Sequence, residues 1–516
     1  MTNFPYRLTS RIILTCLLLF AIPLAAAGER MADALSAFRT LTAHQPVWSA
    51  PGRLESLLLQ LDPLRADGLD PQAYGVDGLR AASIRGGKDA CIETLATLAY
   101  LHALDDLAHG RLEQDQVEAM WHADAAPARS DAVLLARRGA DGLDDIAAAF
   151  DAVRPNLPVY AALREHLLAL FALSATPEPP PVPADETLRQ GMTHPAVSAL
   201  RARLAHHGFD APPTPEPAYF DESLTAVVER FQSAHTLQSD GVVGRITRAA
   251  LNLDVNERIA RTRANLERWR WLDADLRATQ VRVDIAAAEL RYLRNGELRW
   301  TSRVQVGRKD RATPLLHSAI NHFTLNPPWV VPPTILRKDK LPAIRANPNV
   351  LQESRLRVLD RSGAELDPDT IDWNAPGPIM LRQDPGPFNA LGRIVMRFPN
   401  PFSVYLHDTP SQRQFSSWQR NFSSGCVRVE GAVDLSALLI EDAAGINREQ
   451  LAAELSTGKT RNLRLNEPVS ILMAYWTADI GEEGALRWRP DSYGNDAPIA
   501  RALAEAPWHD LPHCTP

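Results

Sequence analysis

The 516-residue sequence has no block of basic residues and no apolar run that spans a membrane comfortably. The formal net charge is −7, and without a basic cluster nucleic-acid binding has no support. No H-x-x-E-H motif occurs, so a metal hydrolase has no support either, and we expect neither a metal nor a cofactor. Hydrophobic and charged fractions of 45% and 23% are those of an ordinary globular protein, and the length favours about three domains.

The N-terminus carries the longest apolar run, sixteen residues from Ile12 to Ala27. Arg7 and Arg11 precede it, and it ends in three alanines. A basic start, a short apolar stretch and a small-residue site are typical of a secretory signal peptide, here residues 1–27. A membrane-spanning helix needs about 20 apolar residues, so we expect cleavage and export, with retention as an uncleaved anchor as the alternative.

Cysteine is scarce. Removal of the signal peptide leaves Cys91, Cys426 and Cys514. In an oxidising compartment an odd number leaves at least one thiol free. Cys426 is the natural candidate, and the sequence does not decide whether Cys91 and Cys514 form a disulfide.

The N-terminal half of the chain is predicted to be helical. Residues 31–175 repeat leucine at helical spacing, and residues 176–185 form a proline-rich linker that should be extended and semi-rigid. Residues 186–254 predict a compact three-helix unit ending in D-G-V-V-G-R-I-T-R-A-A-L-N. Its glycines suit a turn and Thr247 suits a helix cap. A polar helix is expected to follow.

The C-terminal half changes to an alternating apolar pattern, which predicts a mostly β domain over residues 278–477. Asn295-Gly296 between two strand-like segments indicates a hairpin. The pattern breaks between about 331 and 398, and an interruption of that length is typical of a lid. Residues 478–516 are expected to form a tail, with a surface loop from Trp488 to Asp496 before a short final helix.

The chemistry is concentrated between Val404 and Glu430, where His407 and Cys426 lie nineteen residues apart. A neighbouring imidazole is the usual device for deprotonating a thiol nucleophile. Gly425 permits close backbone approach, and the N–H groups around it suit an oxyanion. Small and hydroxylated neighbours predict that the Cys426 thiol is reachable from solvent.

H-D-T-P followed by S-S-G-C-V-R resembles the signature of the L,D-transpeptidases, the enzymes with a YkuD-type catalytic domain. The sequence departs from it at Ser424, where many members carry a second histidine. Three further stretches resemble parts of the large Gram-negative members: D-G-L-D-P-Q-A-Y and H-G-R the helical scaffold domain, D-G-x-x-G-x-x-T the peptidoglycan-binding domain, and R-Q-D-P-G-P-F-N-A-L-G-R the capping subdomain. The resemblance implies an α+β multidomain protein with a YkuD-type β-sandwich.

The resemblance also implies residue roles. Cys426 would be a low-pKa nucleophile that carbapenems acylate, and His407 its general base. A backbone carbonyl near the serine–glycine turn, with Ser423 the nearest candidate, would orient His407. Tyr405 and the N–H groups of Gly425 and Cys426 would stabilise the oxyanion.

Substrate contacts follow in the same way. Arg428 would bind a substrate carboxylate, although a structural ion pair explains it equally well. Trp329 would line the pocket or belong to the core. The remaining candidates for the substrate site are Ser424, Arg382, Arg393 and Arg397.

The implied function is 3→3 cross-linking of peptidoglycan stem peptides in the periplasm. Other cell-wall synthases are candidate partners, and the membrane is one only if the signal segment stays attached. The acceptor remains open among a stem peptide, a lipoprotein lysine, a D-amino acid and water. A cysteine peptidase of the NlpC/P60 or papain kind is disfavoured, because those enzymes place cysteine before histidine. The other alternative is a non-catalytic scaffold protein that binds the wall.

Overall fold

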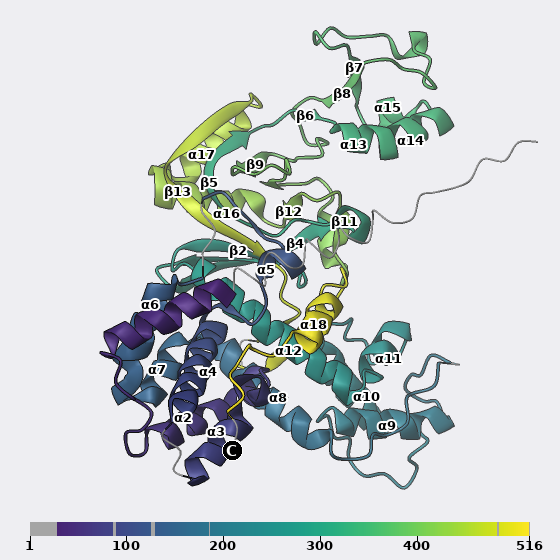
Figure 1. The fold of residues 1–516 in the computed structure, drawn as a ribbon. Helices are drawn as coiled ribbons and strands as arrows, with labels where there is room; N and C mark the ends of the chain where they lie inside the picture. The colour runs from purple at the N-terminus through teal and green to yellow at the C-terminus, as the bar shows by residue number, and fades with distance from the viewer. Residues whose placement is uncertain (1–27, 86–88, 125–128, 185, 482–483, 515–516) are drawn as a thin grey trace, which may run out of the picture.

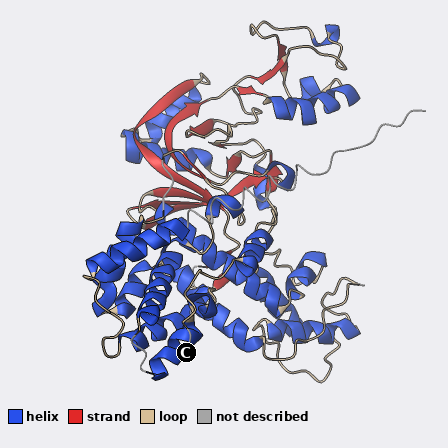
Figure 2. Cartoon of the chain, in the orientation of Figure 1, coloured by secondary structure: helices blue, strands red, loops and turns tan. Residues whose placement is uncertain are grey.

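The computed structural model describes residues 28–85, 89–124, 129–184, 186–481 and 484–514. The predicted signal peptide, residues 1–27, lies outside the described residues. Helices gather in one part of the molecule and strands in another (Figures 1 and 2), so the predicted α+β multidomain fold is confirmed. Within the described ranges, no helix is both long and apolar enough to cross a membrane.

The N-terminal region is a helical bundle whose apolar stripes face a common core. Residues 28–41 are helical, and 3₁₀ turns η1 (Asp62–Asp67) and η2 (Pro71–Tyr74) follow the next helix. The most buried helix is α4, which begins at an Asp89 cap. The labelled helices of the bundle are α2 (Arg53–Leu61), α3 (Val76–Arg85), α4 (Ala90–His109), α5 (Gln114–Val117), α6 (Ala132–Asp141), α7 (Ile146–Val153) and α8 (Pro158–Leu173).

A disulfide joins the C-terminal end of the described chain to the helical bundle. Cys91, at the start of α4, is bonded to Cys514 across 423 residues of sequence. Leu511 and Cys514 also pack against the core of the helical bundle. The pairing that the sequence left open is therefore made, and Cys426 is the free cysteine among the described residues.

The three-helix unit consists of α9 (Pro195–His206), α10 (Glu222–Ala234) and α11 (Arg245–Leu251). Its turn is held by the buried Gln232, which bonds to the backbone of Asp240 and Gly241 and to the Thr247 hydroxyl. Thr247 therefore lies inside α11 and caps nothing, contrary to prediction. The proline-rich linker is anchored to this unit, because Val182 is buried in its core and the Val182 backbone bonds to the Asn252 side chain.

Helix α12 (Val255–Leu272) runs between the helical bundle, the tail and the β domain, and 3₁₀ turn η4 (Asp273–Asp275) ends it. It begins with a capping box between Asp254 and Glu257. Although polar in sequence, its second half is buried, and Arg268 and Arg270 are 0% and 1% exposed. Arg268 forms ion pairs with Glu118 and Asp496, so this helix is bonded to residues from other parts of the chain.

The β domain is one sheet whose strand pairing closes on itself, since β5 pairs with both β13 and β9. Asn295 and Gly296 both have positive φ and form the predicted two-residue hairpin. Helix α16 (Ala432–Ala444) packs against β13 and β9, and α17 (Arg448–Ser456) follows it. The strands are β1 (Trp121–His122), β2 (Gln280–Asp284), β3 (Glu289–Arg294), β4 (Glu297–Gly307), β5 (Leu316–Leu325), β9 (Ile394–Arg397), β10 (Leu406–His407), β11 (Asn421–Ser423), β12 (Val427–Val429) and β13 (Arg461–Ala474).

A separate small unit interrupts the sheet between β5 and β9 and projects from one end of the molecule (Figure 1). We call residues 329–391 the cap. The predicted boundaries of 331 and 398 need correction, because Trp329 pairs within the cap and Ile394 has returned to the main sheet. The cap contains β6 (Trp329–Val330), α13 (Pro333–Ile335), π-helix η6 (Leu336–Lys340), α14 (Leu341–Ala346), α15 (Val350–Glu353), β7 (Arg357–Leu359), 3₁₀ turn η7 (Pro368–Thr370) and β8 (Met380–Gln383).

The tail is an integral part of the fold. Strands β14 (Ala478–Ile480) and β15 (Leu486–Trp488) form a two-stranded sheet, and α18 (Asp496–Glu505) packs on α12. Trp488 and Arg489 are buried, so the predicted surface loop is wrong at its start. The polar sequence misled the interpretation because Arg489 lies 3.8 Å from the carboxylates of Asp284 and Asp479, whose side chains are 13% and 12% exposed.

Candidate active site

Four of the predicted site residues lie on or directly before two neighbouring parallel strands, β10 and β12. Leu406 lies opposite Val427, and His407 lies opposite Arg428. Leu406 and Val427 are fully buried in the core of the β domain. Alternate residues of a strand point to opposite faces. His407 and Arg428 therefore point away from the core, with Tyr405 directly before β10 and Cys426 directly before β12, where the Cys426 side chain also packs against the edge of the core.

The turn before Cys426 is held by two hydroxyl groups. Gly425 has φ +112°, which L side chains rarely adopt, and its carbonyl accepts a hydrogen bond from the Thr313 hydroxyl at 2.9 Å. The Ser423 hydroxyl donates to the Cys426 carbonyl at 2.5 Å and accepts the Gly425 N–H at 3.1 Å. The Gly425 N–H is therefore engaged, contrary to its predicted role. The Cys426 N–H has no acceptor among the residues that the structure describes.

His407 is oriented by its neighbour in sequence. Its Nδ1–H donates to the Asp408 carbonyl at 2.5 Å, which leaves Nε2 unprotonated as the basic nitrogen. The carbonyl predicted near Ser423 is not the partner; the Ser423 carbonyl accepts from the backbone N–H of Arg308. The imidazole is 4% exposed, and burial, assisted by the charge of Arg428, lowers its pKa to about 3. At neutral pH the ring is uncharged.

The Cys426 thiol is partly accessible, yet protein surrounds it closely enough that burial raises its pKa above the ordinary value. Hydrogen bonds from the Tyr405 backbone N–H and hydroxyl act in the opposite direction, as does the charge of Arg428. The nearest hydrogen-bond acceptor is the Ser403 carbonyl, 3.9 Å from Sγ. The predicted low-pKa thiolate is therefore wrong for the resting state, in which the thiol and the imidazole are both neutral and, among the described residues, share no hydrogen bond with each other.

Two guanidinium groups flank this face. Arg428 bonds to the side-chain oxygens of Gln305 at 3.0 Å and Gln414 at 3.5 Å and has no carboxylate partner among the described residues, so the structural ion pair is not formed. Arg397 bonds to Thr324 and lies over the Tyr405 ring, 5.1 Å from its centroid. The site thus presents positive charge without a fixed counter-ion beside the thiol.

The predicted cap residues reach the site less directly. Trp329 is buried in the apolar core of the cap, the core role that the sequence offered as its alternative. Arg382 pairs with Asp384 at 3.2 Å. Arg393 is exposed, and its backbone N–H donates to the Asp408 carboxylate at 2.9 Å. A Cβ on Gly392 would lie about 2.3 Å from that same carboxylate, so only glycine fits there. Asp408, the aspartate of H-D-T-P, thus fixes the point where the chain leaves the cap.

One contact between the cap and the turn before Cys426 was not predicted from the sequence. Arg311, in 3₁₀ turn η5 (Lys309–Arg311), forms a bidentate pair with Asp339 of the cap at 2.6 and 2.7 Å. The same guanidinium donates to the Ser424 hydroxyl at 3.0 Å. Ser424 therefore contacts a group that holds the cap. No motif signals the pair, because its members lie 28 residues apart in different structural units.

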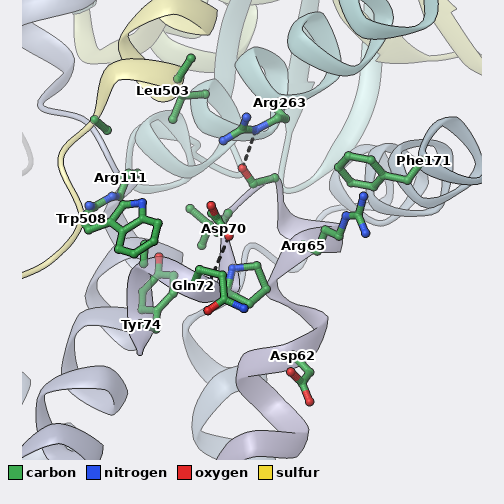
Figure 3. A pocket seen from close by; sticks show the side chains of 16 residues that line it. Asp62, Arg65, Asp70, Gln72, Tyr74, Arg111, Phe171, Arg263, Leu503 and Trp508 are labelled. Atoms are coloured by element: carbon green, nitrogen blue, oxygen red, sulfur yellow. Dashed lines mark hydrogen bonds between the residues drawn. The ribbon is translucent and has the colours of Figure 1, made fainter. Parts of the chain in front are cut away.

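A cavity between the helical bundle, α12 and the tail is separate from this site (Figure 3). It measures about 540 Å³, and residues of D-G-L-D-P-Q-A-Y form much of its wall. Asp70 caps the turn there through the N–H of Gln72, and Arg263 donates to the Gly68 carbonyl. None of its lining residues comes from β10 or β12, so these scaffold motifs build a wall remote from Cys426.

Comparison with known proteins identifies the domains. The chain matches the models of the L,D-transpeptidase catalytic domain (YkuD) over residues 278–442, the scaffold domain over 33–167 and the "Putative peptidoglycan binding domain" over 193–251. It is 36% identical over 229 residues to a "Putative L,D-transpeptidase" of Haemophilus influenzae, covering 44% of this chain and 46% of that protein. The chain thus spans about half the length of the curated relative it matches.

Two solved structures are also similar. An L,D-transpeptidase from Xylanimonas cellulosilytica is 17% identical, with 57% of this chain and 99% of that one covered and a TM-score of 0.17. An L,D-transpeptidase from Stackebrandtia nassauensis is 12% identical, with 57% and 96% covered and a TM-score of 0.20. At these scores the two structures carry no argument about the site.

Proposed function

Because the chain belongs to the L,D-transpeptidase family through its catalytic domain, we propose that it is an exported enzyme that cross-links peptidoglycan stem peptides through Cys426. One observation supports this most: Tyr405, His407, Cys426 and Arg428 lie on or directly before two paired strands. The same observation disfavours a non-catalytic scaffold protein, which needs no such grouping. The peptidoglycan-binding-like unit supports the wall as partner.

In the proposed acylation, His407 Nε2 takes the Cys426 proton as Sγ attacks the carbonyl of the third stem residue, diaminopimelate. The Cys426 N–H and the Tyr405 hydroxyl donate to the oxygen that becomes negative. Collapse of the tetrahedral adduct breaks the amide bond, and His407 returns the proton to the departing D-Ala amine. The product is a thioester on Cys426.

In the second step the side-chain amine of another diaminopimelate attacks the thioester carbonyl. His407 takes a proton from that amine, and the thiol leaves and is reprotonated. The result is a 3→3 cross-link. Arg428 and Arg397 carry the charge needed for the carboxylates of the donor peptide, with Arg428 suited to a bidentate contact.

The test is mass spectrometry of purified tetrapeptide muropeptides incubated with residues 28–516. With the parent protein we expect released D-Ala and cross-linked dimers. Cys426→Ala should give neither product. Arg448→Ala, on the exposed surface, is the control and should give both. Loss of D-Ala without dimers would identify water as acceptor, that is, an L,D-carboxypeptidase. Addition of a lysine peptide as competitor tests the lipoprotein-anchoring alternative. Dimer formation by Cys426→Ala would contradict the proposal.

A further inference from the structure

Three residues far apart in the sequence meet where the helical region joins the β domain. Strand β1, from the helical half, adds to the edge of the sheet in parallel with β5, and this register places His122 opposite His317. Asp275, at the end of η4, points between them. One nitrogen or oxygen atom of each residue lies within 4.8 Å of the others.

The Asp275 carboxylate is short of hydrogen-bond donors. It is 1% exposed, and among the described residues His122 Nε2 is the one group that bonds to it, at 3.1 and 3.3 Å. His317 Nδ1 lies 3.7 Å from it, too far for a hydrogen bond. A carboxylate accepts about four hydrogen bonds, and burying one without partners is costly. A cation between the three side chains removes that cost.

The hydrogen bonds around His317 hold its ring in the orientation that a metal ligand needs. His317 Nε2 lies 3.1 Å from the Ser470 hydroxyl, which also accepts from Gln280 Nε2 at 3.1 Å. Gln280 Nε2 in turn donates to the Asp275 backbone carbonyl at 2.9 Å. With its Nε2–H on Ser470, His317 turns the Nδ1 lone pair toward the carboxylate. Metal-bound histidines typically donate their second ring N–H to such a partner.

We propose that His122, Asp275 and His317 bind one divalent transition-metal ion, with Zn²⁺ as the best match. Two imidazole nitrogens and a carboxylate oxygen, with one solvent molecule, make a tetrahedral set. Bonds of about 2.0–2.2 Å separate two ligand atoms by at most about 4.4 Å, so modest side-chain rotations close the cluster. The ion ties β1 to β5 and to the end of α12.

This site lies on elements other than β10 and β12, so it is structural and independent of the proposed transpeptidation. Sequence motifs do not locate it. The one histidine pair spaced H-x-x-x-H is His509 and His513 in the tail, and His509 instead bonds to Asp106 at 2.9 Å and stacks on His102.

The test titrates chelator-treated residues 28–516 with ZnCl₂ by calorimetry, in a Cys426→Ser background that removes the free thiol. We expect one equivalent bound and a higher melting temperature after loading. His122→Gln, which keeps a donor to Asp275, and His317→Gln should each weaken binding at least about 100-fold, and Ser470→Ala about 10–100-fold. His322→Gln, on the same strand β5, is the matched control and should bind as the parent does.

Cobalt gives a readout that does not depend on the variants. Co²⁺ added to the parent protein should produce the visible absorption bands of a four-coordinate site, and one equivalent of Zn²⁺ should remove them. Binding that survives unchanged in both histidine variants would overturn the proposal, as would the absence of any stoichiometric binding by a correctly folded parent protein.

Discussion

At the scale of single residues, the catalytic face starts from neutral groups. The Asp408 carbonyl fixes the His407 tautomer, and burial keeps both the imidazole and the thiol uncharged at neutral pH. The thiol proton must therefore move to His407 as the substrate arrives. Such a site avoids a standing thiolate, which oxidants attack most readily.

This arrangement predicts the pH dependence of Cys426 alkylation by iodoacetamide. The folded pKa of the thiol lies above its ordinary value of 9.0, so the thiolate fraction grows as pH rises through that value. The rate should still be rising at pH 9, and no step should appear near pH 6.5, because His407 is neutral down to about pH 3. Alkylation is followed by intact mass, with Cys426→Ser as control. A plateau beginning below pH 7 would indicate a thiolate–imidazolium pair and contradict the expectation.

At the scale of elements, α12 shows how a polar helix can be buried. Arg268 is 0% exposed and bonds to Glu118 and Asp496, which come from the helical region and from α18. The same guanidinium lies 5.5 Å from the centre of the Tyr475 ring. One side chain thus joins four separate parts of the chain.

Arg268→Ala should lower the free energy of unfolding by about 3–5 kcal/mol, because it leaves two buried carboxylates without their partner. Arg448→Ala is the matched control: its pair with Asp434 is 60% and 45% exposed, and its loss should cost less than about 1 kcal/mol. Urea unfolding followed by circular dichroism measures both variants. Equal, small effects would mean that water replaces Arg268 without cost.

The elements that the sequence predicted well are those set by local chemistry. Asn295-Gly296 forms its hairpin, and Cys426 follows a glycine turn that leads into the strand beside His407. The failures concern partners supplied by distant parts of the chain. Periodicity treats arginine as exposed, so it missed the burial of Arg268, and spacing cannot show that Ser423 bonds to the Cys426 carbonyl. In both cases the environment of the side chain depends on a partner that the local sequence does not reveal.

At the scale of the whole molecule, the cap is built as an insertion that can be removed. Leu325 at the end of β5 pairs with Ile394 at the start of β9, and the Asn326 N–H bonds to the Arg393 carbonyl. The chain therefore leaves and re-enters the sheet at one place. Within the sheet, Val395 is buried against the apolar core of the cap, and Tyr405 packs beside it. The cap thus contacts the strands that carry the proposed catalytic residues.

Replacing residues 328–391 by a short Gly-Ser turn should therefore separate two kinds of reaction. Without the cap, distant parts of a stem peptide no longer help to orient the reacting carbonyl, and transpeptidation should fall about 100-fold or more. Acylation of Cys426 by a carbapenem, which needs chiefly the thiol and the oxyanion donors, should fall much less. Turnover is measured by muropeptide analysis and acylation by intact mass.

The control for this deletion is a variant that loosens the cap without removing it. Arg311→Gln breaks the pair with Asp339 and keeps a donor for Ser424, so it should reduce transpeptidation while leaving the melting temperature and carbapenem acylation nearly unchanged. Circular dichroism must first show that the deletion variant folds, since removal exposes Val395. Equal losses of both reactions in a folded deletion variant would show that the cap supports the catalytic strands and does not position the substrate.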